Sequence, residues 1–305
     1  MTQDAILHSG MASIVGRPNV GKSTLLNKLV GEKIAIVSNV PQTTRNQVRG
    51  IYTDERGQIV FVDTPGLHMP KDKLDRFMQK SAYTTTDETD CVIHLVDVSE
   101  PTGEEEEAIV RRLAKLRIPV IMGLNKIDIT DKFIPDYIEL WERIKGCPVT
   151  EFGNFHMIPV SGKAGTNIDE LMDILFKHLP EGEPLYPSDV VTDIPQKMAI
   201  ADIVREKLFG VLRQEIPHAI AVVIESIEQR KKAVYIRVLI FVESDSQKRI
   251  VVGKQGGTLK EVGKLARQDL QDLLEAKVFI ELFVKAKKNW RDDISLLQEM
   301  GYDSI

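Results

Sequence analysis

The segment from Gly16 to Ser23, GRPNVGKS, combines glycines, a lysine and a serine at the spacing of a phosphate-binding loop. It follows the apolar run MASIV and precedes STLLNKLV, so it would join a strand to a helix. In that setting backbone N–H groups can surround phosphates, Lys22 can reach the β- and γ-phosphate oxygens, and the Ser23 hydroxyl can bind Mg²⁺. The residues expected to contact a nucleotide here are Gly16, Arg17, Pro18, Asn19, Val20, Gly21, Lys22, Ser23 and Thr24.

A second segment, DTPG at residues 63–66, follows the apolar run IVFV. Asp63 would therefore lie at a strand end facing the first loop, where a carboxylate orients Mg²⁺ or its water ligands. The backbone N–H of Gly66 is suited to sense the γ-phosphate, so we expect Lys22, Asp63 and Gly66 to act in hydrolysis. The residues of this segment expected to contact the nucleotide are Asp63, Thr64, Pro65, Gly66 and Leu67.

A third segment, NKID at residues 125–128, follows PVIMGL and again marks a strand end. A carboxylate there can accept two hydrogen bonds from the N1–H and N2–H₂ groups of guanine, a donor pair that adenine lacks. The segment therefore predicts that the bound base is guanine and that the nucleotide is GTP or GDP. The contacting residues expected here are Asn125, Lys126 and Asp128.

These loops need a sheet whose strands end at one edge. Up to about residue 180, short β-branched runs alternate with longer amphipathic ones, as in CVIHLVDVS followed by EEEEAIVRRLAKL. The alternation predicts an α/β domain, a mostly parallel sheet with helices on both faces, in which ligands collect at the carboxyl ends of the strands. Residues 48–64 contain two extended runs around ERG and predict a hairpin inside that sheet.

A Pro- and Gly-rich stretch, LPEGEPLYPS at residues 179–188, separates this part from the rest. We expect domains at 1–180 and 198–305, with a linker at 181–197. In the second domain the sequence pattern predicts a helix near 198–214 and strands near 219–227 and 233–242. Two helical stretches around a glycine loop, a strand near 278–284 and a short last helix follow. That order is α-β-β-α-α-β.

The glycine loop of the second domain is GKQG at residues 253–256. It lies between two helices and lacks the GK[ST] ending, so it is not a second nucleotide loop. Two helices that meet at GxxG let the backbone of a nucleic acid approach closely, because glycine has no Cβ. Lys and Arg number 18 against 16 Asp and Glu after residue 197, whereas the preceding part has 22 against 29. The residues expected to contact RNA are Lys248, Arg249, Val252, Gly253, Lys254, Gln255, Gly256, Lys260 and Lys264.

The three nucleotide segments resemble those of the translation-factor class of P-loop GTPases, and the second domain resembles a type II KH domain. By that resemblance Ser161, Gly162 and Lys163 form a further box that packs against guanine. PQTTR at residues 41–45 resembles the first switch, in which Thr44, rather than the neighbouring Thr43, binds Mg²⁺ together with Ser23 and Asp63 and contributes to hydrolysis. Ras-like relatives carry a glutamine at the position of Leu67, so hydrolysis is expected to be slow, although Leu67 can equally be a packing residue.

The combination of GRPNVGKS, QTTR, DTPG, NKID, VVGKQGGTLK and NWRDDISLLQEMGY resembles the Era family of bacterial GTPases from about residue 11 onward. The resemblance implies binding to the 3′ end of 16S rRNA, a role in 30S subunit assembly, and peripheral contact with the cytoplasmic face of the inner membrane. An obligate protein partner cannot be inferred from it. Residue spacing and charge by themselves indicate only GTP and single-stranded RNA.

The remaining composition argues for a cytoplasmic protein. Cys91 and Cys147 form no CxxC pair, and no run of about 18 apolar residues could span a membrane. The acidic run at 104–107 is expected to be a solvated first turn of a helix, and Asp97 to be structural. Two other functions stay open: a passive RNA-binding adaptor with a merely structural nucleotide domain, and a GTPase that acts chiefly at the membrane or in cell-cycle control.

Overall fold

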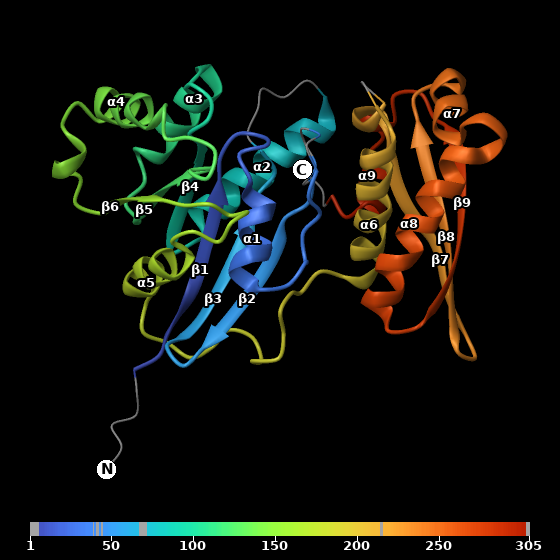
Figure 1. Cartoon of the computed structure of the whole chain (residues 1–305), viewed down its shortest axis with the longest axis horizontal. Helices are drawn as coiled ribbons and strands as arrows, with labels where there is room; N and C mark the ends of the chain where they lie inside the picture. Colours follow the sequence, from blue (N-terminus) through green and yellow to red (C-terminus); the bar gives the residue numbers. More distant parts are fainter. Residues whose placement is uncertain are drawn as a thin grey trace, which may run out of the picture. The chain divides into compact units, whose positions relative to one another are not determined.

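The structure is a computed structural model that describes residues 6–38, 40, 43, 45–66, 72–213 and 216–302. The chain divides into two compact units (Figure 1). The first unit contains residues 1–35, 44–71 and 78–193, and the second contains residues 36–43, 72–77 and 194–305. The division at Asp193 and Ile194 falls inside the linker expected at 181–197. The sequence did not predict that two short segments of the amino-terminal half, residues 36–43 and 72–77, group with the second unit.

A six-stranded sheet, in the order β2-β3-β1-β4-β5-β6, forms the centre of the first unit. Its strands are β1 (His8–Val15), β2 (Val48–Asp54), β3 (Gly57–Asp63), β4 (Cys91–Asp97), β5 (Val120–Asn125) and β6 (Phe155–Pro159). All neighbours are parallel except β2 and β3, which form the predicted hairpin. Strands β3, β4 and β5 are buried along their whole length, which explains their continuous apolar sequences.

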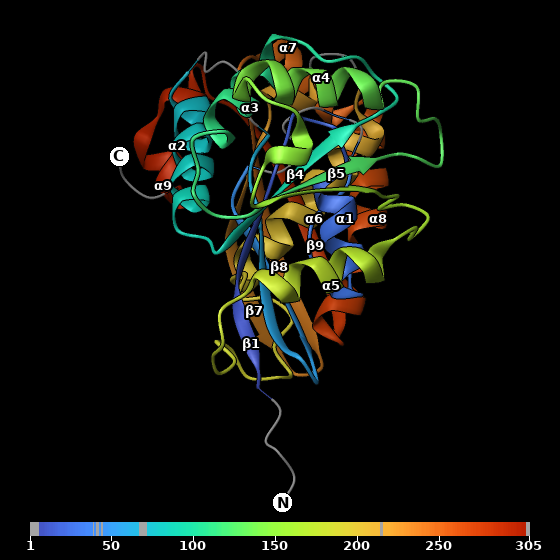
Figure 2. The same cartoon turned by 90° about the vertical axis from the view of Figure 1, so that its left-hand side faces the viewer.

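The helices of this unit are α1 (Lys22–Val30), α3 (Glu104–Leu113), α4 (Ile134–Lys145) and α5 (Ile168–His178), together with α2 (Lys73–Asp87) from Met78 onward, because the first residues of α2, up to Phe77, group with the second unit. Helices α3 and α4 lie side by side (Figures 1 and 2) and share one apolar core with β1, β4 and β5. Helix α1 packs on β2 and β3, and α5 packs on β1. A short 3₁₀ turn, Val149–Glu151, follows α4. The α/β architecture expected from the sequence is therefore confirmed.

The second unit has the predicted α-β-β-α-α-β order. It consists of α6 (Gln196–Val211), β7 (Ala221–Arg230), β8 (Ala233–Val242), α7 (Asp245–Val252), α8 (Gly257–Leu274) and β9 (Lys277–Ala286), followed by α9 (Ile294–Glu299). Three-residue 3₁₀ turns lie at Pro217–Ala219, Lys254–Gly256 and Trp290–Asp292. The sheet order is β7-β8-β9, with β7 antiparallel and β9 parallel to β8. Buried and exposed residues alternate along the first part of β8, because one face of the sheet packs on the core that α6 and α8 share with it.

Across the described ranges, no helix is both long enough and apolar enough to cross a membrane.

Candidate functional site

The four segments singled out in the first unit all follow strands that point the same way. Strand β1 ends just before the first loop, β3 ends at Asp63, β5 ends at Asn125, and β6 ends just before Ser161. Because β1, β3, β5 and β6 are linked through parallel pairings, their carboxyl ends meet at one edge of the sheet. The structure therefore brings the four boxes together at the edge where ligands of such sheets bind.

Glycine is required in the first loop by close contacts as well as by backbone angles. A Cβ atom added at Gly16 would lie 2.2 Å from the backbone oxygen of Leu95. Gly21, the residue before α1, has a φ of 102°, and a Cβ there would lie 2.5 Å from Nδ2 of Asn125. Neither position can carry a side chain without moving the loop, so the loop closes tightly over the amino terminus of α1.

Lys22 is buried, and its amine is turned back toward the loop. Its Nζ donates hydrogen bonds to the carbonyl oxygens of Gly16, at 3.0 Å, and Arg17, at 2.8 Å. Burial lowers the pKa of this amine to about 8, and the negative charges of Asp63 and Glu106 offset only part of that effect. A phosphate group placed in the loop would favour the charged amine, so the geometry suits an anion.

Ser23 and Asp63 supply the oxygen atoms that a small hard cation prefers. The Ser23 hydroxyl donates to Oδ2 of Asp63 at 2.7 Å, and the carboxylate is fully buried. A hydroxyl and a carboxylate beside a phosphate loop form the donor set of an Mg²⁺ site, so these residues fit the metal. The third expected ligand, Thr44, lies outside the described residues, as does Leu67. In the part of the chain that is described, no three His, Cys, Asp or Glu residues form another possible metal site.

The DTPG segment lies against the first loop. Gly66 is buried, and a Cβ atom added to it would lie 3.0 Å from both Cα and N of Pro18. The Thr64 hydroxyl donates to the carbonyl oxygen of Ile14 at 2.9 Å and so ties the segment to β1. The backbone N–H of Gly66 is thereby held within the loop region, where it was expected to sense phosphate.

Asn125 joins the first loop to the last box. Its Nδ2 donates to the carbonyl oxygen of Val20 at 2.7 Å, and its Oδ1 accepts from the backbone N–H of Gly162 at 3.0 Å. Asp128 is exposed three residues later, as a carboxylate that reads a base must be. Ser161 is buried and Lys163 is exposed. Asn125 is therefore the residue that holds three of the boxes in register.

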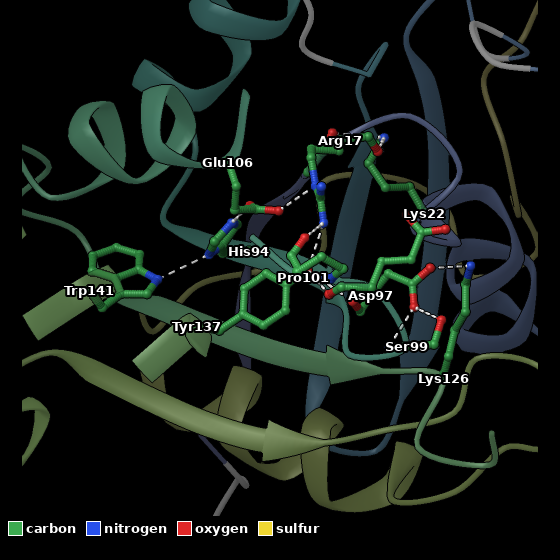
Figure 3. Close-up of polar contacts among 12 residues, drawn as sticks. Arg17, Lys22, His94, Asp97, Ser99, Pro101, Glu106, Lys126, Tyr137 and Trp141 are labelled. Atoms are coloured by element: carbon green, nitrogen blue, oxygen red, sulfur yellow. Dashed lines mark hydrogen bonds and ion pairs between the residues drawn. The ribbon is translucent and has the colours of Figure 1, made fainter. Parts of the chain in front are cut away.

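A buried polar group that the sequence did not indicate lies behind the first loop (Figure 3). The run 104–107 was expected to be solvated, and for Glu106 this is wrong: its side chain is fully buried, with its carboxylate between Arg17 and His94. Residues 109, 110 and 113 are also buried, so position 106 shares their helix face, and a period of three to four residues could have revealed it. Asp97, expected to be structural, forms an ion pair with Lys126.

In the second unit, the GxxG loop connects α7 to α8 as expected. Gly253 has φ 74° and ψ 172°, and Gln255 and Gly256 also have positive φ values. Among the residues expected to contact RNA, Lys254, Gln255, Lys260 and Lys264 are exposed around the loop, as is Arg249, while Lys248 and Val252 are partly buried. Ile250 is 52% exposed, because it falls on the outer face of the short helix α7.

Comparison with known proteins places this geometry in a family. Residues 11–126 match the family described as 50S ribosome-binding GTPase, and residues 215–291 match the KH domain family. GTPase Era of Halothermothrix orenii is 44% identical over 295 residues, which cover 96% of this chain and 98% of that protein.

Two solved structures are similar over 98% of this chain and 100% of their own chains. One is an Aquifex aeolicus Era variant bound to GDP·AlF₄⁻, with 38% identity and a TM-score of 0.90. The other is Era in complex with MgGDPNP and nucleotides 1506–1542 of 16S ribosomal RNA, with 37% identity and a TM-score of 0.91. The chain belongs to the Era family of GTPases, with a P-loop GTPase domain followed by a KH domain.

Proposed function

We propose that this protein is a molecular switch that binds GTP with Mg²⁺, hydrolyses it slowly, and binds the single-stranded 3′ end of 16S rRNA during assembly of the 30S subunit. The observation that carries the proposal is the convergence of four guanine-nucleotide boxes at one sheet edge, in a chain whose second unit has a GxxG loop between two helices. The relative solved with 16S rRNA nucleotides supports the choice of RNA.

The residues of the first unit have separate roles in this proposal. Backbone N–H groups of the first loop and the Lys22 amine hold the phosphates, and the N–H of Gly66 responds to the γ-phosphate. Asp128 accepts hydrogen bonds from guanine, while Asn125 keeps the neighbouring loops in place. Since the Leu67 side chain cannot hydrogen-bond to water, orientation of the attacking water depends on another group, and hydrolysis without that help is slow.

Ser23 and Asp63, with Thr44 as the third expected ligand, hold Mg²⁺ in this proposal. When bound, Mg²⁺ neutralises charge that develops on the phosphate oxygens. The 2.7 Å hydrogen bond between the Ser23 hydroxyl and Asp63 keeps two of these oxygen donors together.

Single-stranded RNA lies along the GxxG loop in this proposal. Gly253 lets the loop fold closely against Thr258, and Gly256, where an added Cβ would meet no atom within 4 Å, leaves room for the RNA backbone. The exposed amines of Lys254, Lys260 and Lys264 contact its phosphates. Val252 is half-buried beside the loop and contributes to the wall of the base-binding groove.

Coupling between nucleotide and RNA follows from the composition of the second unit. It includes residues 36–43, which directly precede Thr44, and residues 72–77, which follow the DTPG region. Within this unit Arg205 donates to the carbonyl oxygen of Thr43 at 3.1 Å, and Arg291 is paired with Asp72 and Asp75. Movement of either segment with the γ-phosphate would therefore act on the residues that fold the RNA-binding unit. A ligand shifts such an equilibrium only through its differential affinity, so RNA and GTP should favour each other's binding.

The proposal assigns residues 1–180 to the GTPase domain, 181–197 to the linker and 198–305 to the KH domain. The division of the units at Asp193 and Ile194 supports a boundary inside that linker. We place the protein in the cytoplasm, in peripheral contact with the inner membrane at most.

The test measures binding of the purified protein to a 3′-terminal 16S rRNA oligonucleotide with GDP and with a non-hydrolysable GTP analogue. We expect tighter binding with the analogue and a loss of binding in Gly253→Asp, because its Cβ would overlap Thr258 and shift the loop and its carboxylate would repel the RNA backbone. Equal affinity in the two nucleotide states would refute the switch. Binding that Gly253→Asp leaves intact would refute the assignment of the loop.

A second measurement separates the switch from a passive RNA-binding adaptor. Lys22→Ala removes the amine that contacts the phosphates, and we expect it to abolish both GTP hydrolysis and 30S assembly in a depletion strain. Normal assembly in that variant, with hydrolysis lost, would favour the adaptor.

A further inference from the structure

The first unit contains a buried polar network that the functions proposed above do not use. It includes Glu106 on α3 and His94 on β4, whose side chains are fully buried (Figure 3). A carboxylate taken out of water is costly unless charged or hydrogen-bonding groups replace its hydration. The partners of Glu106 therefore show what the network holds in place.

The histidine end of the network has a single consistent tautomer. The indole Nε1–H of Trp141 can only donate, and it lies 3.2 Å from Nδ1 of His94, so Nδ1 is the acceptor. The proton of a neutral imidazole is then on Nε2, which donates to Oε1 of Glu106 at 2.7 Å. This hydrogen bond fixes one oxygen of Glu106 against the core.

The other carboxylate oxygen faces the nucleotide loop. Oε2 of Glu106 lies 2.7 Å from Nε of Arg17, a residue of the loop whose side chain is only 15% exposed. The Nη2 of the same guanidinium donates to the hydroxyl of Tyr137 on α4 at 2.6 Å. That hydroxyl in turn donates to the carbonyl oxygens of Asp97, at 2.9 Å, or Glu100, at 3.1 Å. The Arg17 side chain is thus held from α3 and α4 at once.

The backbone of Arg17 carries this restraint into the phosphate site. Its carbonyl oxygen accepts a hydrogen bond from the Lys22 amine at 2.8 Å, and the Gly16 carbonyl accepts a second at 3.0 Å. A rotation of the Arg17 peptide would move the amine that reaches the phosphates. The guanidinium points away from this amine, toward Glu106 (Figure 3), so its contact with Glu106 fixes the shape of the loop.

We infer that Glu106 is a positioning residue for the nucleotide loop. Glu106 acts through Arg17 and thereby sets the affinity for the β-phosphate of guanine nucleotides. This inference rests on the proposed function, because it concerns the same nucleotide site. Only a carboxylate suits position 106: the groups facing its two oxygens are a guanidinium and an imidazole N–H, both donors. A glutamine offers one acceptor oxygen and turns an amide N–H₂ toward one of those donors.

The test compares Glu106→Gln with Glu107→Gln in the full chain, using fluorescent GDP and GMP. The neighbouring acid is an apt control, because Glu107 pairs with Arg111 and Arg143 at the surface and does not contact the loop. We expect Glu106→Gln to bind GDP at least about tenfold more weakly while GMP, which lacks the β-phosphate, changes little; tenfold corresponds to about 1.4 kcal/mol. Glu107→Gln should match the wild type for both nucleotides.

Equal GDP affinity in Glu106→Gln and wild type would overturn the positioning role. Equal losses of affinity for GDP and GMP would also overturn it, because a general weakening of the fold would cause such losses. Should Glu106→Gln fail to fold, Tyr137→Phe and Arg17→Lys perturb the same restraint while a cation stays beside the buried carboxylate. Their losses of GDP affinity should then be less than additive in the double variant, and additive losses would refute the network. Failure of the wild type to bind GDP would instead refute the proposed function.

Discussion

Replacement of Gly253 by alanine tests whether the shape of the GxxG loop sets the stability and RNA affinity of the second unit. The backbone of Gly253 has φ 74° and ψ 172°, a combination that residues with a Cβ rarely adopt. A Cβ atom at this position would lie 2.1 Å from Oγ1 and 2.8 Å from the backbone N of Thr258. The next turn of chain therefore leaves no space for a methyl group.

The loop offers two matched controls with different backbone angles. Gly256 has φ 75° and ψ 13°, and Gly257 is helical at φ −59° and ψ −45°; no atom lies within 4 Å of an added Cβ at either one. Backbone strain at Gly253 amounts to about 1–3 kcal/mol before the overlap with Thr258 is added. Gly256→Ala should cost about 1–2 kcal/mol. Gly257→Ala should instead stabilise the unit by about 0.4–1 kcal/mol.

Amide hydrogen exchange of α7 and α8 measures these differences, because it reads the second unit separately from the first. We expect protection to fall most in Gly253→Ala, less in Gly256→Ala, and to rise slightly in Gly257→Ala. RNA affinity should fall by about tenfold or more in Gly253→Ala, since relief of the overlap must move the loop. Equal protection in all three variants, or a Gly253→Ala protein as stable as wild type, would refute this account of the loop.

Three further predictions concern the first unit. Asn125→Ala leaves the Val20 carbonyl and the Gly162 N–H without their buried partner. The free energy of unfolding, measured by chemical denaturation, should therefore fall by about 2–4 kcal/mol, and the affinity for GDP should fall as well. The pKa of Lys22 is about 8, and the phosphates of a bound nucleotide would raise it. Above about pH 8, nucleotide binding should therefore be coupled to protonation of Lys22. GDP affinity should be flat below about pH 7 and drop about tenfold by about pH 9; Lys22→Ala, which retains only the titration of guanine, should lack most of that drop. Ser23→Ala removes one metal oxygen, and titration with Mg²⁺ should then no longer tighten GTP analogue binding as it does in wild type; an unchanged Mg²⁺ effect would exclude this ligand.

Much of the fold and the site could be read from short stretches of sequence. The glycines and Lys22 of the first loop follow a strand and begin a helix, and the order α-β-β-α-α-β of the second unit came from local periodicity. Burial of Glu106 was missed, because charged runs at a helix start are usually solvated and the partners Arg17 and His94 come from distant parts of the chain.

The sequence by itself determined the chemistry that is possible here, because the proposed phosphate loop, metal carboxylate, base-reading aspartate and GxxG loop are each made by residues adjacent in the chain. It also predicted a boundary region, through a run rich in proline and glycine that cannot continue a helix or strand. Tertiary structure alone decided which residues support those loops. Contacts such as Glu106 with Arg17, or Arg291 with Asp72, join residues far apart in the chain, and only packing brings them together. The grouping of residues 36–43 and 72–77 with the second unit depends on such contacts, so no local pattern could have revealed it.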